Sequence, residues 1–514
     1  MTIPRPQPLP HWVWLLLALV LAPGIGGVSA QERSSDPAAG RLLLEASRLQ
    51  KSGETQAALK EYELLVERFP ESQQAEEALF LLIQGRAAQG DRDGAETAAR
   101  RLTGDYPRSP FAAAAYVLLA KMLTDNPKNP QDVEEARTTL HRVPLLFGRE
   151  SYPRLDWRHR ARVESGRLSL QLGEASRAAA AFVSAIEEET SSPWTSQARV
   201  GLAEILLAEG DWVAAADELQ RVLLHNESGG HPEADSGAAA DARRRLTLIH
   251  RLFLRPAAGR DRWLQARLLA VPGIVLKKPV GVSANDSGHL LIADRGTGTV
   301  IELGAGGAIK KRRQAKNPGR PWWSAEEAFL SDGADLRRME DLWSKTFVAR
   351  NGSKAEPVKE IASGERGAFG QWYLLDSKAK RVVVFVPKGS YLNTLASGDP
   401  VDLAQDSRGR MYVLDAKTNR VTRYSANGEV LGLAARGDWQ KPVAVDVDAA
   451  GQIYVLDRAA ARVDIFATDG SRLTSLGPQL PGGIALRNPL DLTVDGSGRL
   501  IIADNRLPGV VVLE

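Results

Sequence analysis

The stretch KPVAVDVDAAGQIYVLDRAAARVDIFATDGSRL, residues 441–473, decides the fold of the C-terminal half of this chain. From Pro442, apolar residues alternate with small or polar ones until a turn at Ala449–Gly451, and the next apolar run ends at Asp457. Two further short segments follow, separated by a Thr-Asp-Gly turn. Short alternating runs between such turns predict four antiparallel β-strands.

The apolar run that ends in Leu-Asp or Ala-Asp recurs along the second half of the chain. Its copies end at Asp294, Asp376, Asp415, Asp457 and Asp504. The intervals are 82, 39, 42 and 47 residues, so the first interval has room for one more, degenerate copy near Asp335. A unit of short strands that recurs about every 40 residues is typical of a β-propeller, and six units predict six blades.

These units resemble the NHL repeat. In that repeat a proline opens a strand of small and apolar residues, a glycine turn follows, and an apolar strand ending in Asp leads into a stretch with Asn and Arg. Asn419-Arg420-Val421 and Asn505-Arg506 keep this last element. The resemblance implies an NHL-type propeller over residues 271–514.

The way in which the propeller closes can also be predicted. The chain ends at Glu514, directly after the third strand of the last unit, so that blade needs a fourth strand from elsewhere. Gly273–Lys278 (GIVLKK), upstream of the first unit, is the expected donor. Pairing the two ends of the propeller would cover both open sheet edges.

The first half of the chain carries a different repeat, rich in Ala, Leu, Arg and Glu at helical spacing. Each copy begins with a glycine, and small or apolar residues follow 5, 9 and 12 positions later. A glycine in this place is typical of a helix end, and small residues allow two helices to approach closely. The pattern therefore predicts helical hairpins, with an irregular copy around Ala120–Pro144; the regular copies begin at Gly53, Gly90, Gly173 and Gly210.

This pattern resembles the tetratricopeptide repeat, and more loosely its longer version in bacterial periplasmic and outer-membrane assembly proteins. The resemblance implies a right-handed solenoid over residues 38–255 whose concave face holds a peptide or another protein. Residues 256–270 are expected to connect the two domains. Asn226–Ala240, which is poor in bulky residues, is expected to be a flexible loop.

Composition limits the function classes. The 514 residues have a net charge of +3, which argues against a nucleic-acid-binding protein as a whole. The chain has no cysteine, so disulfides, thiolate metal sites, cysteine nucleophiles and cysteine-linked lipids are excluded.

The N-terminus has the features of an export signal. An apolar run at Trp12–Ala22 follows Arg5, and a small-residue site, Val28–Ala30, precedes Gln31. The run is too short for a bilayer-spanning helix of about 20 residues, so we expect cleavage after Ala30 and a periplasmic or secreted protein. An uncleaved anchor is the alternative.

The repeated aspartates invite two interpretations. They could line a central calcium site, as in a calcium-dependent propeller hydrolase or lyase of the lactonase kind. Alternatively, each one closes a strand and caps backbone N–H groups at the following turn, as a fold requirement. The second interpretation is preferred, because His289 is the one histidine of the propeller half and no established catalytic motif is present. We therefore expect no cofactor, with an oxygen-ligated calcium ion as the alternative.

The segment KKRRQAKNPGRP, residues 310–321, has six basic residues and no acidic one, and two tryptophans follow it directly. Basic and aromatic residues together could bind an anionic cell-wall polymer through charge and stacking. The plainer interpretation is a solvated loop whose tryptophans pack on the degenerate blade. The candidate binding residues are Lys310, Lys311, Arg312, Arg313, Trp322 and Trp323.

Together these features predict a multidomain α and β protein, with a helical-repeat solenoid followed by a six-bladed propeller that is closed by strands from both of its ends. The expected function is an exported, non-catalytic scaffold that binds other envelope proteins or peptides. The calcium-dependent hydrolase or lyase and the glycan or anionic-surface binder are the alternatives.

Overall fold

The computed structural model describes residues 36–514, except 126, 128, 149–155, 189–191, 228–231, 260, 325–326, 342 and 368. The expected signal sequence therefore lies outside the described residues. The chain forms two compact units, the first up to Leu168 together with Ser184–Thr195, and the second made of Ser169–Val183 and Ser196–Glu514.

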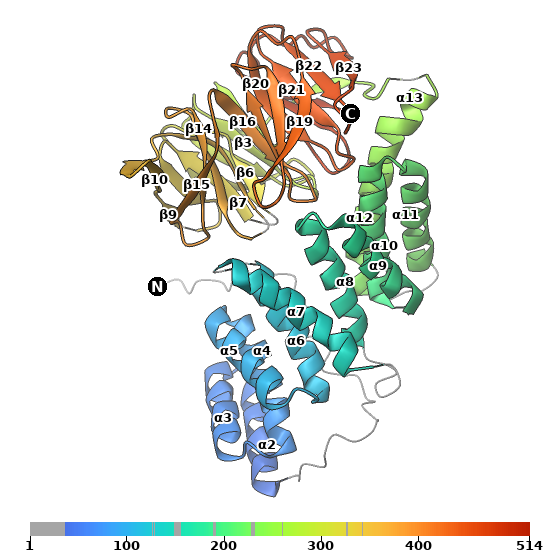
Figure 1. Cartoon of the computed structure of the whole chain (residues 1–514), viewed down its shortest axis with the longest axis vertical. Helices are drawn as coiled ribbons and strands as arrows, with labels where there is room; N and C mark the ends of the chain where they lie inside the picture. Colours follow the sequence, from blue (N-terminus) through green and yellow to red (C-terminus); the bar gives the residue numbers. More distant parts are fainter. Residues whose placement is uncertain are drawn as a thin grey trace. The chain divides into compact units, whose positions relative to one another are not determined.

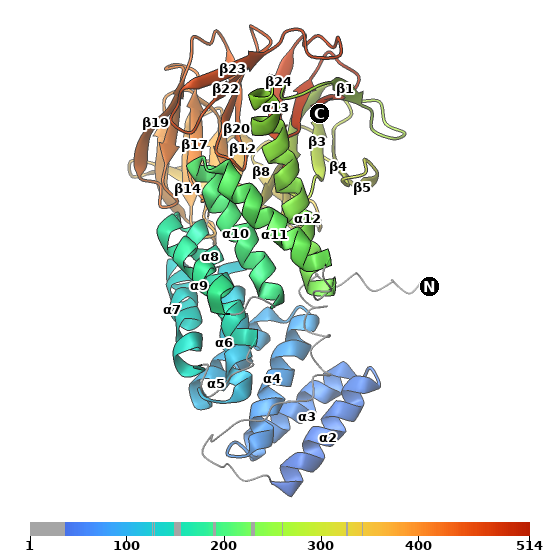
Figure 2. The ribbon, with the colours of Figure 1, turned by 90° about the vertical axis from the view of Figure 1, so that its right-hand side faces the viewer.

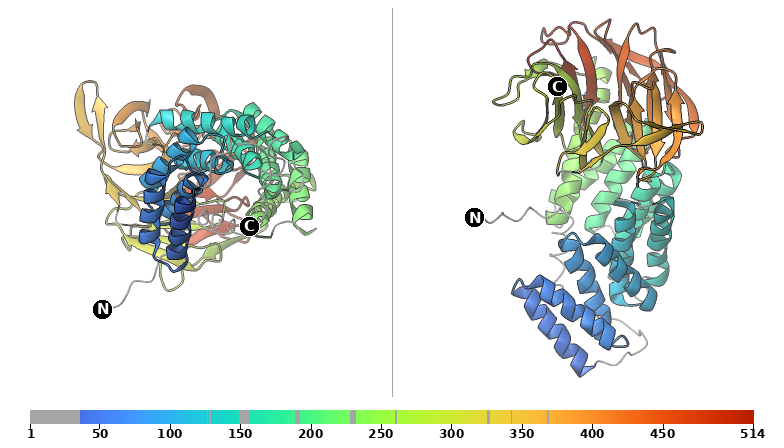
Figure 3. Two further views of the ribbon diagram at one scale, coloured as in Figure 1. Left: turned by 90° about the horizontal axis from the view of Figure 1, so that it is seen from below. Right: turned by 90° about the vertical axis from the view of Figure 1, so that its left-hand side faces the viewer.

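The N-terminal half consists of α-helices in successive antiparallel pairs, coloured blue to green in Figure 3. The expected helical repeat is confirmed, and the irregular copy corresponds to α6 and α7. None of the described helices is long and apolar enough to cross a bilayer. The helices are α2 (Pro37–Lys51), α3 (Thr55–Arg68), α4 (Gln73–Ala88), α5 (Arg92–Asp105), α6 (Pro110–Asp125), α7 (Pro130–Leu146), α8 (Asp156–Gln171), α9 (Ala175–Glu188), α10 (Pro193–Glu209), α11 (Trp212–Glu227) and α12 (Pro232–Ile249).

The repeat-starting glycines end the first helix of each regular pair. Gly53, Gly90, Gly173 and Gly210 have φ angles between 77° and 88°, which is the left-handed conformation that glycine adopts at low cost. The residues 5, 9 and 12 positions after each glycine are all buried. Small residues also bring helices together, since a Cβ on Gly201 would lie 2.4 Å from the Phe182 ring.

The loop expected at Asn226–Ala240 is helical from Pro232 onward, where α12 begins. Proline is tolerated at the start of a helix, and the following alanines favour helix. α12 continues through a π-helical turn, η2 (His250–Leu254), into α13 (Arg255–Ala257). The loop prediction was therefore wrong for this part of the segment.

The C-terminal half is a six-bladed β-propeller, as predicted (Figure 1). Each blade is a four-stranded antiparallel sheet, and a separate hairpin of β10 and β11 follows the second blade. The blades are β2 (Pro279–Ala284), β3 (Leu290–Asp294), β4 (Thr299–Leu303) and β5 (Ile309–Gln314); β6 (Trp322–Ser324), β7 (Glu327–Asp332), β8 (Asp335–Arg338) and β9 (Ser344–Lys345), followed by β10 (Val348–Asn351) and β11 (Lys354–Pro357); β12 (Ile361–Arg366), β13 (Trp372–Asp376), β14 (Arg381–Phe385) and β15 (Tyr391–Ser397); β16 (Pro400–Gln405), β17 (Met411–Asp415), β18 (Arg420–Tyr424) and β19 (Val430–Arg436); β20 (Pro442–Val447), β21 (Ile453–Asp457), β22 (Arg462–Phe466) and β23 (Arg472–Leu476); and β24 (Pro489–Val494), β25 (Leu500–Asp504) and β26 (Val510–Leu513) with β1 (Ala266–Leu269).

The propeller closes through strands from both of its ends, as expected. The donor strand is β1, upstream of the Gly273–Lys278 segment that we predicted. β1 pairs antiparallel with β26, with Ala266 opposite Leu513 and Leu269 opposite Val510. The prediction of the donor segment was wrong because the chain makes an additional turn at Val271–Ile274 before it enters the first blade.

The end of the helical region packs on the propeller within the second unit (Figure 2). Leu248 of α12 and Leu252 of η2 belong to the same apolar core as strands of the fifth and sixth blades. Trp263 is also part of this core, and its indole N–H donates to the Gly498 carbonyl at 2.9 Å. This contact places the last helical turn directly against the closing blade.

Candidate functional site: the propeller axis

The aspartates that end the second strands hold blade turns together. Asp294 accepts hydrogen bonds from the backbone N–H groups of Lys277 and Lys278 at 3.0 and 2.6 Å. The other four Leu-Asp and Ala-Asp aspartates make the same kind of contact with residues 16 or 17 positions upstream, and this confirms the structural interpretation; they are Asp376, Asp415, Asp457 and Asp504.

The degenerate copy has its equivalent aspartate at Asp332, where β7 ends. Asp332 accepts from the backbone N–H of Asn317 at 2.7 Å and lies opposite Pro318. Asp335, near which we predicted this copy, opens the next strand, β8. The degenerate blade therefore lies where the repeat interval placed it.

The inner strands of the six blades carry one equivalent residue each near the propeller axis. The strand registers align Pro318 with the residues that open the other blades, among them Pro400 and Pro489, so that Arg320 is equivalent to Asp402 and Asp491. The three intervening blades have small residues at this position. In chain order the six residues are Gly281, Arg320, Ser363, Asp402, Ala444 and Asp491.

Arg320 connects this ring across the axis. Its guanidinium forms ion pairs with Asp402 at 2.6 Å and Asp491 at 3.2 Å. It also donates to the backbone carbonyls of three inner strands, those of Val401, Val443 and Leu490. Gly281 makes room for this arrangement, because a Cβ there would lie 2.9 Å from the Arg320 Cα.

The two aspartates join neighbouring blades at the same time. Asp402 accepts from the Val445 N–H at 2.9 Å, and Asp491 accepts from the Val282 N–H at 2.9 Å. Burial lowers the pKa of Arg320, but the two carboxylates outweigh this and raise it overall. The axis is thus held by an internal, fully paired cation.

A second ring, two residues further along the inner strands, contains two more carboxyl groups. Asp446 accepts from the Val494 N–H at 2.8 Å, and no hydrogen bond of the Glu365 side chain is found among the described residues. Burial raises the pKa of Asp446 to about 6. Burial, with repulsion from Asp446 and Asp402, raises the pKa of Glu365 well above its ordinary value.

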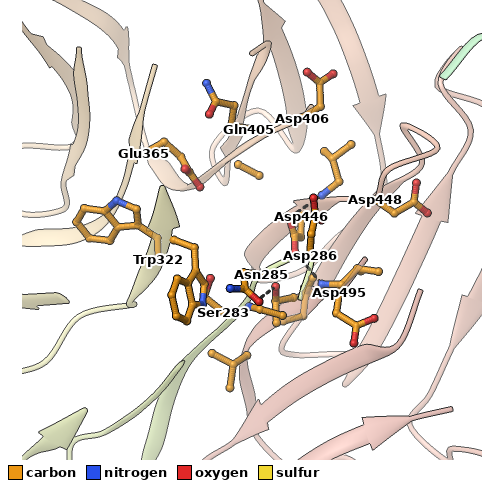
Figure 4. A pocket seen from close by; sticks show the side chains of 18 of the residues that line it. Ser283, Asn285, Asp286, Trp322, Glu365, Gln405, Asp406, Asp446, Asp448 and Asp495 are labelled. Atoms are coloured by element: carbon orange, nitrogen blue, oxygen red, sulfur yellow. Dashed lines mark hydrogen bonds between the residues drawn. The ribbon is translucent and has the colours of Figure 1, made fainter. Parts of the chain in front are cut away.

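This second ring opens into a cavity of about 390 Å³ at one end of the axis (Figure 4). The aspartates around its rim each accept two backbone N–H groups of their own turn. They are therefore used in building the turns; they are Asp406, Asp448 and Asp495. Among the described residues, no group of three or more His, Cys, Asp or Glu side chains is arranged to hold a metal ion.

The raised pKa values predict a decrease in stability as pH rises. The folded-state pKa of Glu365 and Asp446 lies above the unfolded-state value, so the cost of ionisation is absent at low pH and grows as pH rises through the folded pKa. The free energy of unfolding is therefore expected to fall between pH 5 and pH 8. Glu365→Gln should raise the melting temperature at pH 8 by several degrees, at roughly 2–4 °C per kcal/mol, and flatten the profile.

Glu429→Gln, which changes an exposed carboxylate of the fourth blade, is the matched control and should leave the profile unchanged. The test is to measure melting curves of the parent protein, Glu365→Gln and Glu429→Gln at pH 5, 6, 7 and 8. A parent protein whose stability rises over this range, or a Glu365→Gln profile equal to that of the parent, would contradict the interpretation.

The candidate binding residues do not form one surface. Lys310–Arg313 lie on β5, the outermost strand of the first blade, where Lys310 and Arg312 are exposed. Arg313 donates to the Met339 and Asp341 carbonyls, and Lys311 to the Glu340 carbonyl. Their role in binding an anionic polymer stays a prediction.

The two tryptophans lie on β6, an innermost strand. Trp322 is buried in a core with Phe329 and Trp372, and Trp323 packs partly buried between the first two blades. Both also line the axial cavity. The segment is thus not the solvated loop that we considered, although its tryptophans do pack on the degenerate blade.

Arg320 is the important residue that the sequence analysis missed, because we counted it as one member of the basic segment. Its signal is present in the sequence: Pro318-Gly319-Arg320 is in register with Pro400-Val401-Asp402 and Pro489-Leu490-Asp491.

Comparison with protein-family models matches part of the helical half. Residues 163–239 match the model of the tetratricopeptide repeat family. No curated protein matches the sequence. The class of this protein is therefore a tetratricopeptide-type helical repeat followed by a six-bladed β-propeller, and its NHL type stays a prediction.

Solved structures resemble the propeller half. A streptogramin B lyase is 11% identical, with a TM-score of 0.38, covering 49% of this chain and 97% of that one. A gluconolactonase from Xanthomonas campestris is 16% identical, with a TM-score of 0.39, covering 49% and 90%. A calcium-binding regucalcin from Agrobacterium tumefaciens is 16% identical, with a TM-score of 0.37, covering 48% and 92%. These likenesses concern the fold and do not define what this chain binds.

Proposed function

We propose that this protein is an exported, non-catalytic scaffold of the bacterial cell envelope, which binds other proteins through its helical repeat and its propeller. The observation that carries the proposal is the position of Arg320. Its guanidinium takes up the axial carboxylates Asp402 and Asp491, the oxygen donors on which a central metal site would depend. A ring neutralised by its own arginine supports a binding platform rather than a metal-dependent enzyme.

The helical half supports the binding role. Tetratricopeptide-type repeats stack into solenoids with extended surfaces that hold peptides or proteins. The N-terminal sequence supports the export part of the proposal, through the apolar run at Trp12–Ala22 and the small-residue site before Gln31.

The test uses the full chain with a short epitope inserted at Gly352–Ser353, in the exposed turn between β10 and β11, so that both propeller ends stay native. Expressed in a Gram-negative bacterium, the chain is expected in the periplasmic or secreted fraction with Gln31 as its first residue. Cross-linking of that fraction should yield discrete partner polypeptides. A cytoplasmic chain, or one without specific partners, would contradict the proposal.

Metal analysis distinguishes the calcium-dependent alternative. The purified full chain is expected to contain no stoichiometric calcium, and EDTA is expected to leave its melting temperature unchanged, because Arg320 supplies the axial charge. A stoichiometric ion whose removal lowers the melting temperature would instead favour the hydrolase or lyase.

A further inference from the structure

Arg160 of α8 is a buried arginine whose guanidinium contacts two tryptophan rings in the first unit. Its guanidinium carbon lies 4.9 Å from the centre of the Trp157 ring and 4.7 Å from that of the Trp194 ring. The residue is 6% exposed, which is unusual for an arginine without a close acidic partner. Both distances are within the range of a cation–π contact.

The charge of Arg160 is not matched by hydrogen bonds. Its nearest carboxylate among the described residues is Glu164, 3.8 Å from Nε, beyond hydrogen-bonding distance. Glu164 is also shared with Arg167 at 3.6 Å. The Nε atom is buried without a partner, and no described residue accepts a hydrogen bond from this guanidinium.

Such an arrangement is costly unless a ligand completes it. Burying an unpaired charge costs several kcal/mol, and cation–π contacts of about 0.5–2 kcal/mol each offset only part of that cost. The charged groups that act on Arg160 and Glu164 among the described residues are Arg167, Lys121 and Asp125. Together with Arg160 and Glu164 themselves, these are three cations and two carboxylates, so this set carries a positive excess.

The geometry defines what could complete the site. The two indole rings contact the guanidinium carbon but accept no hydrogen bond from its N–H groups among the described residues, so these groups are left for a ligand. Only Nε is sealed without a partner; the two terminal nitrogens are not, so they retain access to solvent. Two parallel N–H groups of a guanidinium can donate to the two oxygens of a planar anion. Arginine favours this bidentate pairing with carboxylates.

We propose that Arg160, in contact with Trp157 and Trp194, is a receptor for a carboxylate group of a partner polypeptide. This inference rests on the proposed scaffold function and gives the chemistry that the helical repeat recognises in its partner. The two indoles orient the guanidinium in advance, so little side-chain freedom is lost when the carboxylate binds.

The proposal is tested with the full chain and three fluorescein-labelled hexapeptides, measured by fluorescence polarisation at low ionic strength. The first contains one glutamate and an amidated C-terminus, the second has a free C-terminal carboxylate and no acidic side chain, and the third has glutamine and an amidated C-terminus. The protein is expected to bind at least one carboxylate peptide and not the third. The first two peptides show whether the carboxylate comes from a side chain or a chain end.

Arg160→Met is expected to weaken carboxylate binding by at least tenfold, and Arg160→Lys by several-fold, because lysine keeps the charge and loses the bidentate edge. Arg177→Met is the matched control, since Arg177 is an exposed arginine of α9 paired with Glu174, and binding should be unchanged. Arg160→Met should melt at the same or a higher temperature, because methionine keeps apolar contact with the indoles without a buried charge.

Several results would overturn the inference. Equal binding of the glutamine peptide, absent binding of every peptide to the parent protein, or unchanged binding by Arg160→Met would each do so. If Arg160→Met lowers the melting temperature and leaves binding intact, Arg160 is a packing residue. If Arg160→Met retains all the cross-linked partners of the parent chain, the proposal that Arg160 binds a partner carboxylate is wrong, and the proposed scaffold function stands. If the parent chain itself has no cross-linked partners, the proposed scaffold function is wrong.

Discussion

Arg320→Met lowers the melting temperature of the propeller by about 6–20 °C: this is the expected result of removing the axial cation. The substitution leaves Asp402 and Asp491 buried at the axis without their shared partner. Removing one partner of a buried ion pair costs about 3–5 kcal/mol, which for a domain of this size corresponds to about 2–4 °C per kcal/mol. Differential scanning calorimetry of the full chain measures the effect.

The control is Arg312→Met, which removes an exposed arginine from β5 and should change the melting temperature little. Adding Asp402→Asn and Asp491→Asn to Arg320→Met should restore part of the stability, because the unpaired charges are then gone. If Arg320→Met and Arg312→Met melt alike, the guanidinium does not hold the axis, and the main support for a non-catalytic propeller is lost.

The second large effect concerns the closing strand. Deletion of Val510–Glu514 is expected to abolish the cooperative melting transition of the propeller. β26 lies between β25 and β1 and pairs with both, and its four residues are at most 1% exposed. Losing four buried apolar side chains costs roughly 6–12 kcal/mol, at about 1.5–3 kcal/mol each, before the lost strand pairing is counted.

A matched deletion removes Gly352 and Ser353 from the exposed turn of the β10–β11 hairpin, and it should leave the transition in place. A milder variant, Val511→Asp, places a charge in the same buried strand and should shift the transition strongly without shortening the chain. A propeller that melts normally without its last five residues would refute the closure.

Much of the fold could be predicted because its signals are local. Three of these signals each indicate a turn or a helix contact within one repeat. They are a left-handed glycine, a small residue five positions later and an apolar run ending in Asp. Gly210 and Asp457 therefore identify their elements without knowledge of the rest of the chain.

The features that were missed depend on contacts between distant residues. Arg320 could be assigned only after the register of its blade was known. That register depends on the pairing of Pro318 with Asp332 and on the irregularity between this pair and the pair Trp322–Phe329. The donor strand β1 has no repeat of its own, and its partner lies at the other end of the propeller. Arg160 was not singled out, since its isolation and its two tryptophans become visible only when α8 and the start of α10 are placed.

The pairing of β1 with β26 also determines when the domain can be completed. Arg267 and Glu514 form an ion pair across 247 positions of sequence. At about 5–20 residues per second, ribosomes need roughly 10–50 s to make the stretch between these strands, and the growing propeller keeps two unpaired edges throughout. The codons of β26 thus set the earliest moment at which the ring can close, and a stop codon before them would release a chain that cannot pair β1 with its partner.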